Sequence, residues 1–316
     1  MQSALFIGVD VAKDNVVVAC SQATFPVRTV PNKPAALKTF LRSLPPQSSI
    51  AMEATGSYHQ DLADLAHQMG LGVYVLNPRD LHHYAKGVGL RAKTDRVDAG
   101  LIARFLANEG PRLRPYQPPT AEQRKIDQLL RRRAKIVTLK TALQLACHDM
   151  PSIRTETANL LKSFTALLKK IDQQLATLQQ AIPERAQQLQ RLQSIPGVGP
   201  LTACWLANLL DRIRFANSDA LVAFTGMDPR PCDSGQKRGQ RRLSKRGPAE
   251  GRRLLFNAAM AAARCQVWKH TYEHYRERGW TTTEAVLILA RKMLRIALAM
   301  YKTQKSFDAQ FIGKTA

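Results

Sequence analysis

Residues 1–20 read MQSALFIGVDVAKDNVVVAC, and this stretch decides the fold of the first part of the chain. It predicts a buried strand over 5–9 that leads into a carboxylate, Asp10, and a second strand over 16–20 after a short polar turn. A carboxylate at the end of a buried strand is costly unless it is paired, hydrogen-bonded or bound to a cation. The sequence therefore raises the question of what stabilises Asp10.

The remainder of the first 110 residues alternates strands and helices. Further strands are expected over 27–30, 49–52 and 73–76, helices over 34–44, 58–69 and 97–106, and a basic loop over 82–96. This order of elements is typical of an α/β domain.

The composition of the 316-residue chain points to a polyanionic partner. Lys and Arg number 47 against 24 Asp and Glu, which gives a net charge of +23. Nucleic acid is the leading candidate, and a merely solvated basic surface is the alternative. Five widely spaced cysteines without a CxxC pair argue against disulfides or a zinc site and for a reducing compartment. Because neither a signal peptide nor a membrane-spanning apolar run is evident, we expect a cytoplasmic protein without membrane association.

A proline-rich segment over 111–119 predicts a linker, and two long helices follow it. The first is expected over 121–150. The second carries apolar residues at alternating steps of three and four, as in a coiled-coil seam: Leu161, Phe164, Leu168, Ile171, Leu175, Leu178 and Ile182. This pattern suits a dimerisation helix and equally an intramolecular hairpin with the first helix. Both hold if two hairpins form a four-helix bundle.

The last part of the chain is predicted to be mostly helical, with a basic, glycine-containing loop over 228–251. We therefore expect three parts. These are a catalytic domain over 1–110, a linker and coiled-coil region over 111–193, and a C-terminal domain over 194–316 that contains the loop.

Four carboxylates form the first candidate site. Asp10 and Glu53 each follow a buried strand, while Asp95 and Asp98 lie one turn apart where the last helix of the first domain begins. Oxygen ligands suit hard cations such as Mg²⁺, and paired ions promote phosphodiester chemistry. The alternative for each residue alone is a cap or surface carboxylate; Asp95 could cap the helix from Val97.

Glycine and basic residues form the candidate nucleic-acid contacts. The turn PGVG, residues 196–199, either presents backbone N–H groups to a phosphate, like a helix-hairpin-helix motif, or simply joins two helices with Val198 packed inward. The full candidate set is Lys93, Arg96, Arg131, Arg132, Arg133, Gly197, Gly199, Lys237, Arg238, Arg241, Arg242, Lys245 and Arg246.

The loop DSGQKRGQRRLSKRG, residues 233–247, contains two serines. Ser234 precedes Gly235, which leaves its hydroxyl uncrowded. A serine is a poor nucleophile without a base or a metal. Composition alone does not separate Ser234 from Ser244.

The motifs GVDVAK, EATG, KTDRVDA, IPGVGP and DSG…GQRRLSKRG occur in this order. With them, the chain resembles the DEDD-type insertion-sequence transposases, the bridge-RNA-guided DNA recombinases related to Piv-type invertases. The resemblance covers essentially the whole chain. It implies a RuvC-like, ribonuclease-H-type N-terminal domain, a coiled-coil connector and a mostly α C-terminal transposase domain.

The resemblance also implies roles for individual residues. Asp10, Glu53, Asp95 and Asp98 would bind Mg²⁺, and Ser234 would attack a DNA phosphate and form a phosphoserine link. The acidic site of one protomer would work with the serine of another in a homodimer or homotetramer. A structured guide RNA would pair with donor and target DNA. The rival interpretations are a RuvC-like endonuclease that uses water and a non-catalytic nucleic-acid-binding protein.

Overall fold

The computed structural model describes residues 5–22, 25–54, 56–90, 94–231, 233–235, 239 and 241–313. The polypeptide forms two compact units, Met1–Pro118 and Pro119–Ala316. The boundary between these units falls inside the proline-rich segment. The finer division at residues 110 and 193 stays a prediction.

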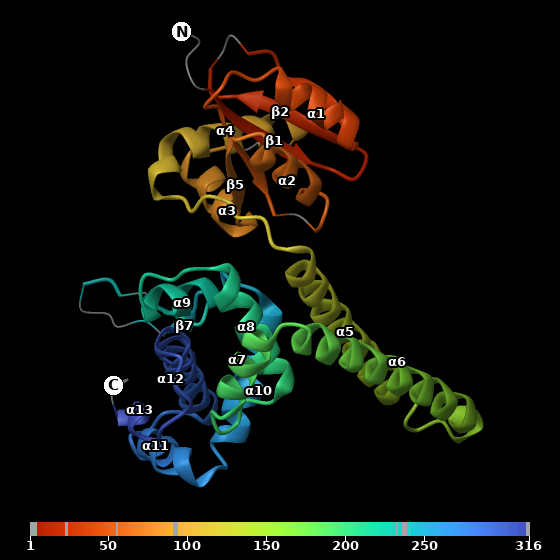
Figure 1. The fold of residues 1–316 in the computed structure, drawn as a ribbon, viewed down its shortest axis with the longest axis vertical. Coiled ribbons are helices and arrows are strands. Elements are labelled where there is room, and N and C mark those ends of the chain that lie inside the picture. Colours follow the sequence, from red (N-terminus) through yellow and green to blue (C-terminus); the bar gives the residue numbers. More distant parts are fainter. Residues whose placement is uncertain are drawn as a thin grey trace. The chain divides into compact units, whose positions relative to one another are not determined.

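The first unit is built on a β-sheet with helices packed beside it (Figure 1). The sheet has five strands in the order β3-β2-β1-β4-β5. Strand β1 pairs antiparallel with β2 and parallel with β4, β2 pairs antiparallel with β3, and β4 pairs parallel with β5. The strands are β1 (Phe6–Val11), β2 (Asn15–Cys20), β3 (Arg28–Pro31), β4 (Ser49–Glu53) and β5 (Gly72–Leu76). This sheet confirms the predicted α/β class of the N-terminal part.

Helices cover both faces of the sheet: α1 (Pro34–Arg42), α2 (Gln60–Gln68), α3 (Pro78–Gly87) and α4 (Asp95–Glu109). Ile7 and Val9 of β1 share one buried cluster with Leu37 of α1 and Leu62 of α2. On the opposite face, Ala51 of β4 packs in a second cluster with residues of α3 and α4. Because side chains alternate along a strand, the residues of β1 that lie between Ile7, Val9 and Val11 face α4.

The expected basic loop over 82–96 is wrong in its first part, because α3 extends to Gly87 and α4 begins at Asp95. Helix α3 starts at Pro78, and the Asn77 side chain accepts a hydrogen bond from the backbone N–H of Arg79. Leu81 and Tyr84 then pack inward, with the Tyr84 ring edge-on to Phe105 of α4. Packing against α4 thus stabilises α3. The exposed basic residues of α3 made this segment look like a loop in the sequence.

The second unit is mostly helical. Helix α8 is buried along most of its length, and apolar residues of α10 and α12 pack in the same core. Among the described residues, no helix is both long and apolar enough to cross a membrane. The elements are α5 (Ala121–Ala146), α6 (Arg154–Gln180), α7 (Pro183–Gln193), α8 (Pro200–Arg212), α9 (Ser218–Thr225), β6 (Pro229–Arg230), β7 (Arg242–Leu243), α10 (Ala249–Ala262), α11 (Gln266–Glu277), α12 (Thr282–Thr303) and α13 (Gln310–Gly313).

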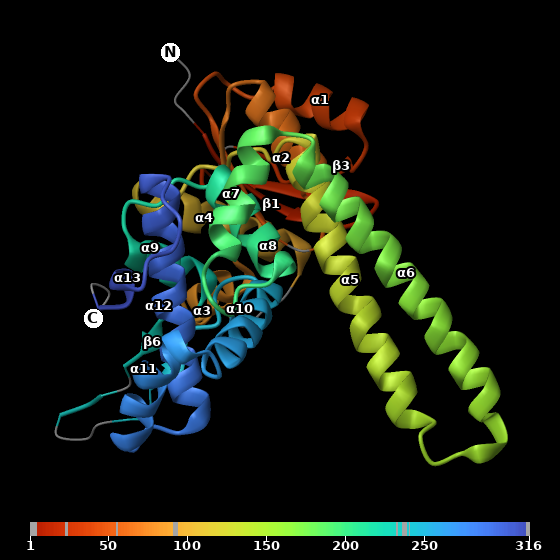
Figure 2. The ribbon, with the colours of Figure 1, turned by 60° about the horizontal axis from the view of Figure 1, so that its bottom comes forward.

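Helices α5 and α6 run side by side as an antiparallel hairpin within one chain (Figure 2). The Arg133 guanidinium binds Asp172 with distances of 2.6 and 3.1 Å, and Lys140 Nζ donates to Thr165 Oγ1 at 2.8 Å. The intramolecular hairpin, one of the two interpretations left open by the sequence, therefore forms. Large apolar residues remain exposed along it, namely Leu139, Leu145, Leu160 and Leu167.

Candidate active site

The sheet places Asp10 beside Glu53. The parallel register pairs Val9 of β1 with Met52 of β4, so the next residues along the two strands are Asp10 and Glu53. Gly8 pairs with Ala51, which belongs to the cluster on the α3 and α4 face. Because side chains alternate, Asp10 and Glu53 lie on this same face one step further along their strands.

Gly8 allows helix α4 to approach β1 closely. A Cβ atom at Gly8 would lie 2.2 Å from the backbone nitrogen of Ala103 and 2.2 Å from the carbonyl oxygen of Ala99. Asp98 directly precedes Ala99 on α4, and Asp95 lies one turn before Ala99. The contact thus brings the acidic first turn of α4 towards the end of β1. The sequence signal, a glycine inside a strand pattern, was present, but its meaning depends on an element 90 residues away.

We expect Gly8→Ala to lower the free energy of unfolding by about 1–3 kcal/mol, because the added methyl group overlaps backbone atoms of α4. Displacement of α4 would also shift the acidic first turn of the helix relative to β1. Chemical denaturation measures the loss of stability. Gly100→Ala is the matched control on α4, since nothing lies within 4 Å of its added Cβ. Equal behaviour of the two variants would contradict this account of Gly8.

Thr94, and not Asp95, caps helix α4. The Thr94 hydroxyl accepts a hydrogen bond from the backbone N–H of Val97 at 3.3 Å, while Asp95 is the first helical residue. The alternative interpretation of Asp95 as the cap is therefore wrong. Asp95 and Asp98 both lie in the first turn of the helix, where the positive end of the helix dipole favours negative charge.

The four predicted carboxylates are coupled electrostatically. Burial raises the pKa of the Asp10 carboxyl above its ordinary value of 3.8. Three further carboxylates raise this pKa by charge repulsion: Asp95, Asp98 and Glu53. Among the described residues, however, no three acidic, histidine or cysteine side chains are placed to enclose a metal ion. Charge repulsion acts over distances longer than a metal–oxygen bond of about 2 Å. The carboxylates therefore lie near enough to Asp10 to repel it, but they do not form a complete set of metal ligands.

The donor chemistry of this cluster fits a hard divalent cation. All four side chains offer oxygen atoms, and their mutual repulsion would be relieved by positive charge between them. Glu53 and Asp98 are half-buried, whereas Asp95 is exposed at the start of α4. A cation at this cluster would therefore remain reachable by a phosphodiester from solvent.

The second unit holds the two candidate serines in different surroundings. Ser234 is exposed, in the loop that joins β6 to β7. Ser244 is 2% exposed, and its hydroxyl donates to Asp228 Oδ1 at the base of that loop. Burial and this hydrogen bond give Ser244 a structural role and leave Ser234 as the serine accessible to a large substrate. Asp228, the partner of Ser244, had no signal in the sequence.

Most basic candidates within the described residues are exposed, with Arg133 as the main exception. Arg96, Arg131, Arg132, Arg241, Arg242, Lys245 and Arg246 are exposed. The Arg133 side chain is 19% exposed and is bound to Asp172, so the structure assigns it to the hairpin. Lys93, Lys237 and Arg238 lie outside the described residues.

The turn over 196–199 packs into the second unit as a helix-helix connection. Gly197 adopts a positive φ of 96°, and a Cβ there would lie 2.5 Å from the carbonyl oxygen of Ala258 on α10. Val198 is buried, while Gly199 has nothing within 4 Å of an added Cβ. Packing alone thus explains Gly197, and a phosphate contact by Gly199 stays a prediction.

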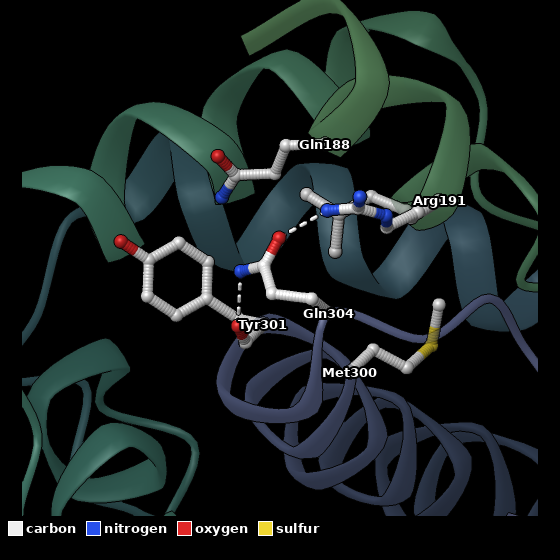
Figure 3. A pocket seen from close by; sticks show the side chains of 6 residues that line it. Gln188, Arg191, Met300, Tyr301 and Gln304 are labelled. Atoms are coloured by element: carbon white, nitrogen blue, oxygen red, sulfur yellow. Dashed lines mark hydrogen bonds between the residues drawn. The ribbon is translucent and has the colours of Figure 1, made fainter. Parts of the chain in front are cut away.

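A shallow pocket in the second unit is lined by none of these candidate residues (Figure 3). Its lining residues come from α7 and from the end of α12 together with Gln304. The Gln304 amide accepts a hydrogen bond from Arg191 and donates one to the backbone oxygen of Tyr301. Arg191 and Gln304 therefore bind each other at this pocket, whereas the buried Gln188 Nε2 has no hydrogen-bond partner among the described residues.

Comparisons with known proteins agree across most of the chain. One family model, described as a transposase, matches residues 7–150, and a second, described as the IS116/IS110/IS902 transposase family, matches residues 189–275. The chain is 28% identical over 270 residues to the pilin gene-inverting protein of Moraxella lacunata, which covers 82% of this chain and 81% of that protein. It is 27% identical to the transposase of insertion sequence element IS1328 from Yersinia enterocolitica, in an alignment that covers 94% of this chain and 96% of that protein. It is 30% identical to the IS1111A transposase of Coxiella burnetii, with 62% and 61% covered.

Proposed function

We propose that the chain is a transposase of the IS116/IS110/IS902 family and that it cuts and rejoins DNA through a Mg²⁺-dependent acidic site and a serine nucleophile, guided by a structured RNA. The observation that carries the proposal is the placement of Asp10 beside Glu53 on the sheet face that packs against α4, whose first turn holds Asp95 and Asp98. Such a cluster is costly for folding and needs a compensating cation.

In this proposal, Asp10, Glu53, Asp95 and Asp98 hold Mg²⁺. The bound cation would neutralise charge on the phosphate and favour the ionised form of the attacking hydroxyl. Asp10 is fixed by β1 and Glu53 by β4, so their carboxylates are held by the sheet. The rigid backbone orients the ligands, and the Gly8 contact sets the position of the acidic turn of α4.

Ser234 is the nucleophile in this proposal. Its Oγ attacks the phosphorus of a DNA phosphodiester and the P–O bond to the departing strand breaks. The proton lost from Oγ is balanced by one taken up by the departing oxygen, which leaves as a DNA hydroxyl. A hydroxyl of the partner strand then attacks the phosphoserine and releases Ser234. One phosphodiester is exchanged for another, so rejoining needs no external energy source. Exposure of Ser234 beside Gly235, in a basic loop, supports this role.

We further propose a RuvC-like fold for the first unit, a coiled-coil connector, and assembly as a homodimer or homotetramer. Support for the fold comes from the strand order, with two antiparallel pairs followed by two parallel ones. Support for assembly comes from the exposed leucines of the hairpin, which a second copy would cover in a four-helix bundle. The acidic cluster and Ser234 lie in different units, so an assembly could combine the cluster of one protomer with the serine of another.

The test combines purified protein, donor and target DNA, Mg²⁺, and RNA transcribed from the non-coding DNA beside the gene. We expect a covalent protein–DNA adduct on a denaturing gel and recombined DNA, both lost when EDTA is added. Adduct without RNA would contradict the guide role. Cleavage without any adduct would favour the water-using endonuclease. DNA binding without cleavage would favour the non-catalytic binding protein.

A further inference from the structure

We propose that Asp233 is a positioning residue that holds the loop carrying Ser234 through Arg241 and Gly239; this inference rests on the proposed role of Ser234. The carboxylate of Asp233 uses both of its oxygens. Asp233 Oδ2 lies 2.8 Å from Nη2 of Arg241, and Asp233 Oδ1 accepts a hydrogen bond from the backbone N–H of Gly239 at 3.1 Å.

The ends of the loop are fixed independently of Asp233. The short strands β6 and β7 pair with each other, and the Ser244 hydroxyl donates to Asp228 just outside them. The Arg252 guanidinium donates to the carbonyl oxygens of Thr225 and Gly247. These contacts fix the base of the loop, and none of them involves Asp233.

Asp233 makes its two contacts inside the loop, next to the proposed nucleophile Ser234. Ser234 follows directly, and Gly235 then adopts a positive φ of 54°, a conformation that favours glycine. The chain thus turns immediately after Ser234 while the residue before it is bonded across the loop. A side chain between a fixed residue and a tight turn has less freedom than one in an open loop, so Ser234 is presented in a narrower range of positions.

The same contact changes the role expected for Arg241. As a member of the basic loop it is a candidate phosphate contact, yet its guanidinium is paired with Asp233. Arg242, Lys245 and Arg246 are exposed at the same base and remain candidates for phosphate contact. The first role of Arg241 is therefore to hold the loop through Asp233. We expect the effects of substituting Arg241 to resemble those of substituting Asp233 more than those of removing a phosphate contact.

The decisive variants are Asp233→Ala, which removes both contacts, and Asp233→Asn, which keeps an acceptor for Gly239 but removes the ion pair. A charge-reversed double variant, Asp233→Arg with Arg241→Asp, restores the pair with opposite polarity. Asp219→Ala is the matched control, because it breaks another ion pair of the same unit, 3.0 Å between Asp219 and Arg295. The measurements are the single-turnover rate of Ser234–DNA adduct formation, the Kd for DNA, and hydrogen exchange at the Gly239 amide.

We expect Asp233→Ala to slow adduct formation by about 10- to 100-fold with little change in DNA Kd, since misplacement of a nucleophile by about 1 Å costs on the order of 10²-fold. Asp233→Asn should lose less, and the double variant should recover part of the rate. A rate equal to that of Asp219→Ala would overturn the inference, as would a defect confined to Kd. If the wild type forms no adduct, the nucleophile assignment fails instead. Hydrogen exchange then decides the loop contact: faster exchange at Gly239 in Asp233→Ala supports it, and unchanged exchange overturns it.

Discussion

Ser234→Ala is expected to abolish the covalent protein–DNA adduct and to reduce recombination by at least about 10³-fold, because alanine has no oxygen to attack the phosphorus. The loss should appear in the chemical step. DNA binding should be unchanged within a factor of about two, since one neutral hydroxyl contributes little beside many phosphate contacts. A denaturing gel with labelled DNA measures the adduct, and filter binding measures the Kd.

Ser244→Ala is the matched control for this prediction. Its hydroxyl is buried and bound to Asp228, so removal leaves a half-buried carboxylate without that partner. We expect a loss of about 1–3 kcal/mol in stability, with the adduct still formed by the folded protein. Recombination at the wild-type rate by Ser234→Ala would refute the nucleophile assignment. Loss of adduct in Ser244→Ala at full folding would move the assignment to Ser244.

Local patterns were sufficient to predict the five strands of the first unit and three of its four α-helices. Strand β1 alternates Ile7, Val9 and Val11, all buried, with residues that face the opposite layer, and this two-residue period was readable directly. The positions of Asp10 and Glu53 at strand ends followed from the same pattern. The proximity of Asp10 and Glu53 then followed from the parallel pairing of their strands, because the carboxyl ends of parallel strands lie at the same edge of the sheet.

Contacts between distant elements were not readable in the sequence. Gly8 is required because the backbone of α4 lies against it, and the role of Ser244 depends on the hydrogen bond that its buried hydroxyl donates to Asp228. Helix α3 was concealed because only its inward face, with Leu81 and Tyr84, carries apolar residues. The hairpin was ambiguous because a seven-residue period fits a partner helix from either the same chain or another.

Asp10→Asn is expected to abolish DNA cleavage and, in metal-free protein, to raise the free energy of unfolding. The asparagine keeps the shape of the side chain but removes a charge that is half-buried and repelled by Asp95, Asp98 and Glu53. A site that stores such repulsion trades stability for function. Thermal denaturation in EDTA measures the gain in stability, and the adduct assay with Mg²⁺ measures the loss of activity.

The stability gain has a defined dependence on pH. Because the pKa of Asp10 is raised in the folded state, folded protein binds this proton more tightly than unfolded protein does. The ionised carboxylate therefore costs stability at a pH above the raised pKa, and this cost disappears as the pH falls towards the ordinary value of 3.8. The difference in Tm between Asp10→Asn and wild type should be largest near neutral pH and should shrink on acidification. A constant difference would contradict the electrostatic origin.

Addition of Mg²⁺ should reverse the order of stability, because ligand binding to the folded state alone raises its Tm. Wild-type protein has four carboxylates to offer, whereas Asp10→Asn lacks the charge that the other three carboxylates repel and should gain little. Asp61→Asn is the matched control, since Asp61 lies in the first turn of α2, whose apolar residues pack on the other face of the sheet. That variant should follow the wild type in EDTA and in Mg²⁺. An equal Mg²⁺-dependent rise of Tm in wild type and Asp10→Asn would show that the cation binds elsewhere, and the proposed ligand set would then be rejected.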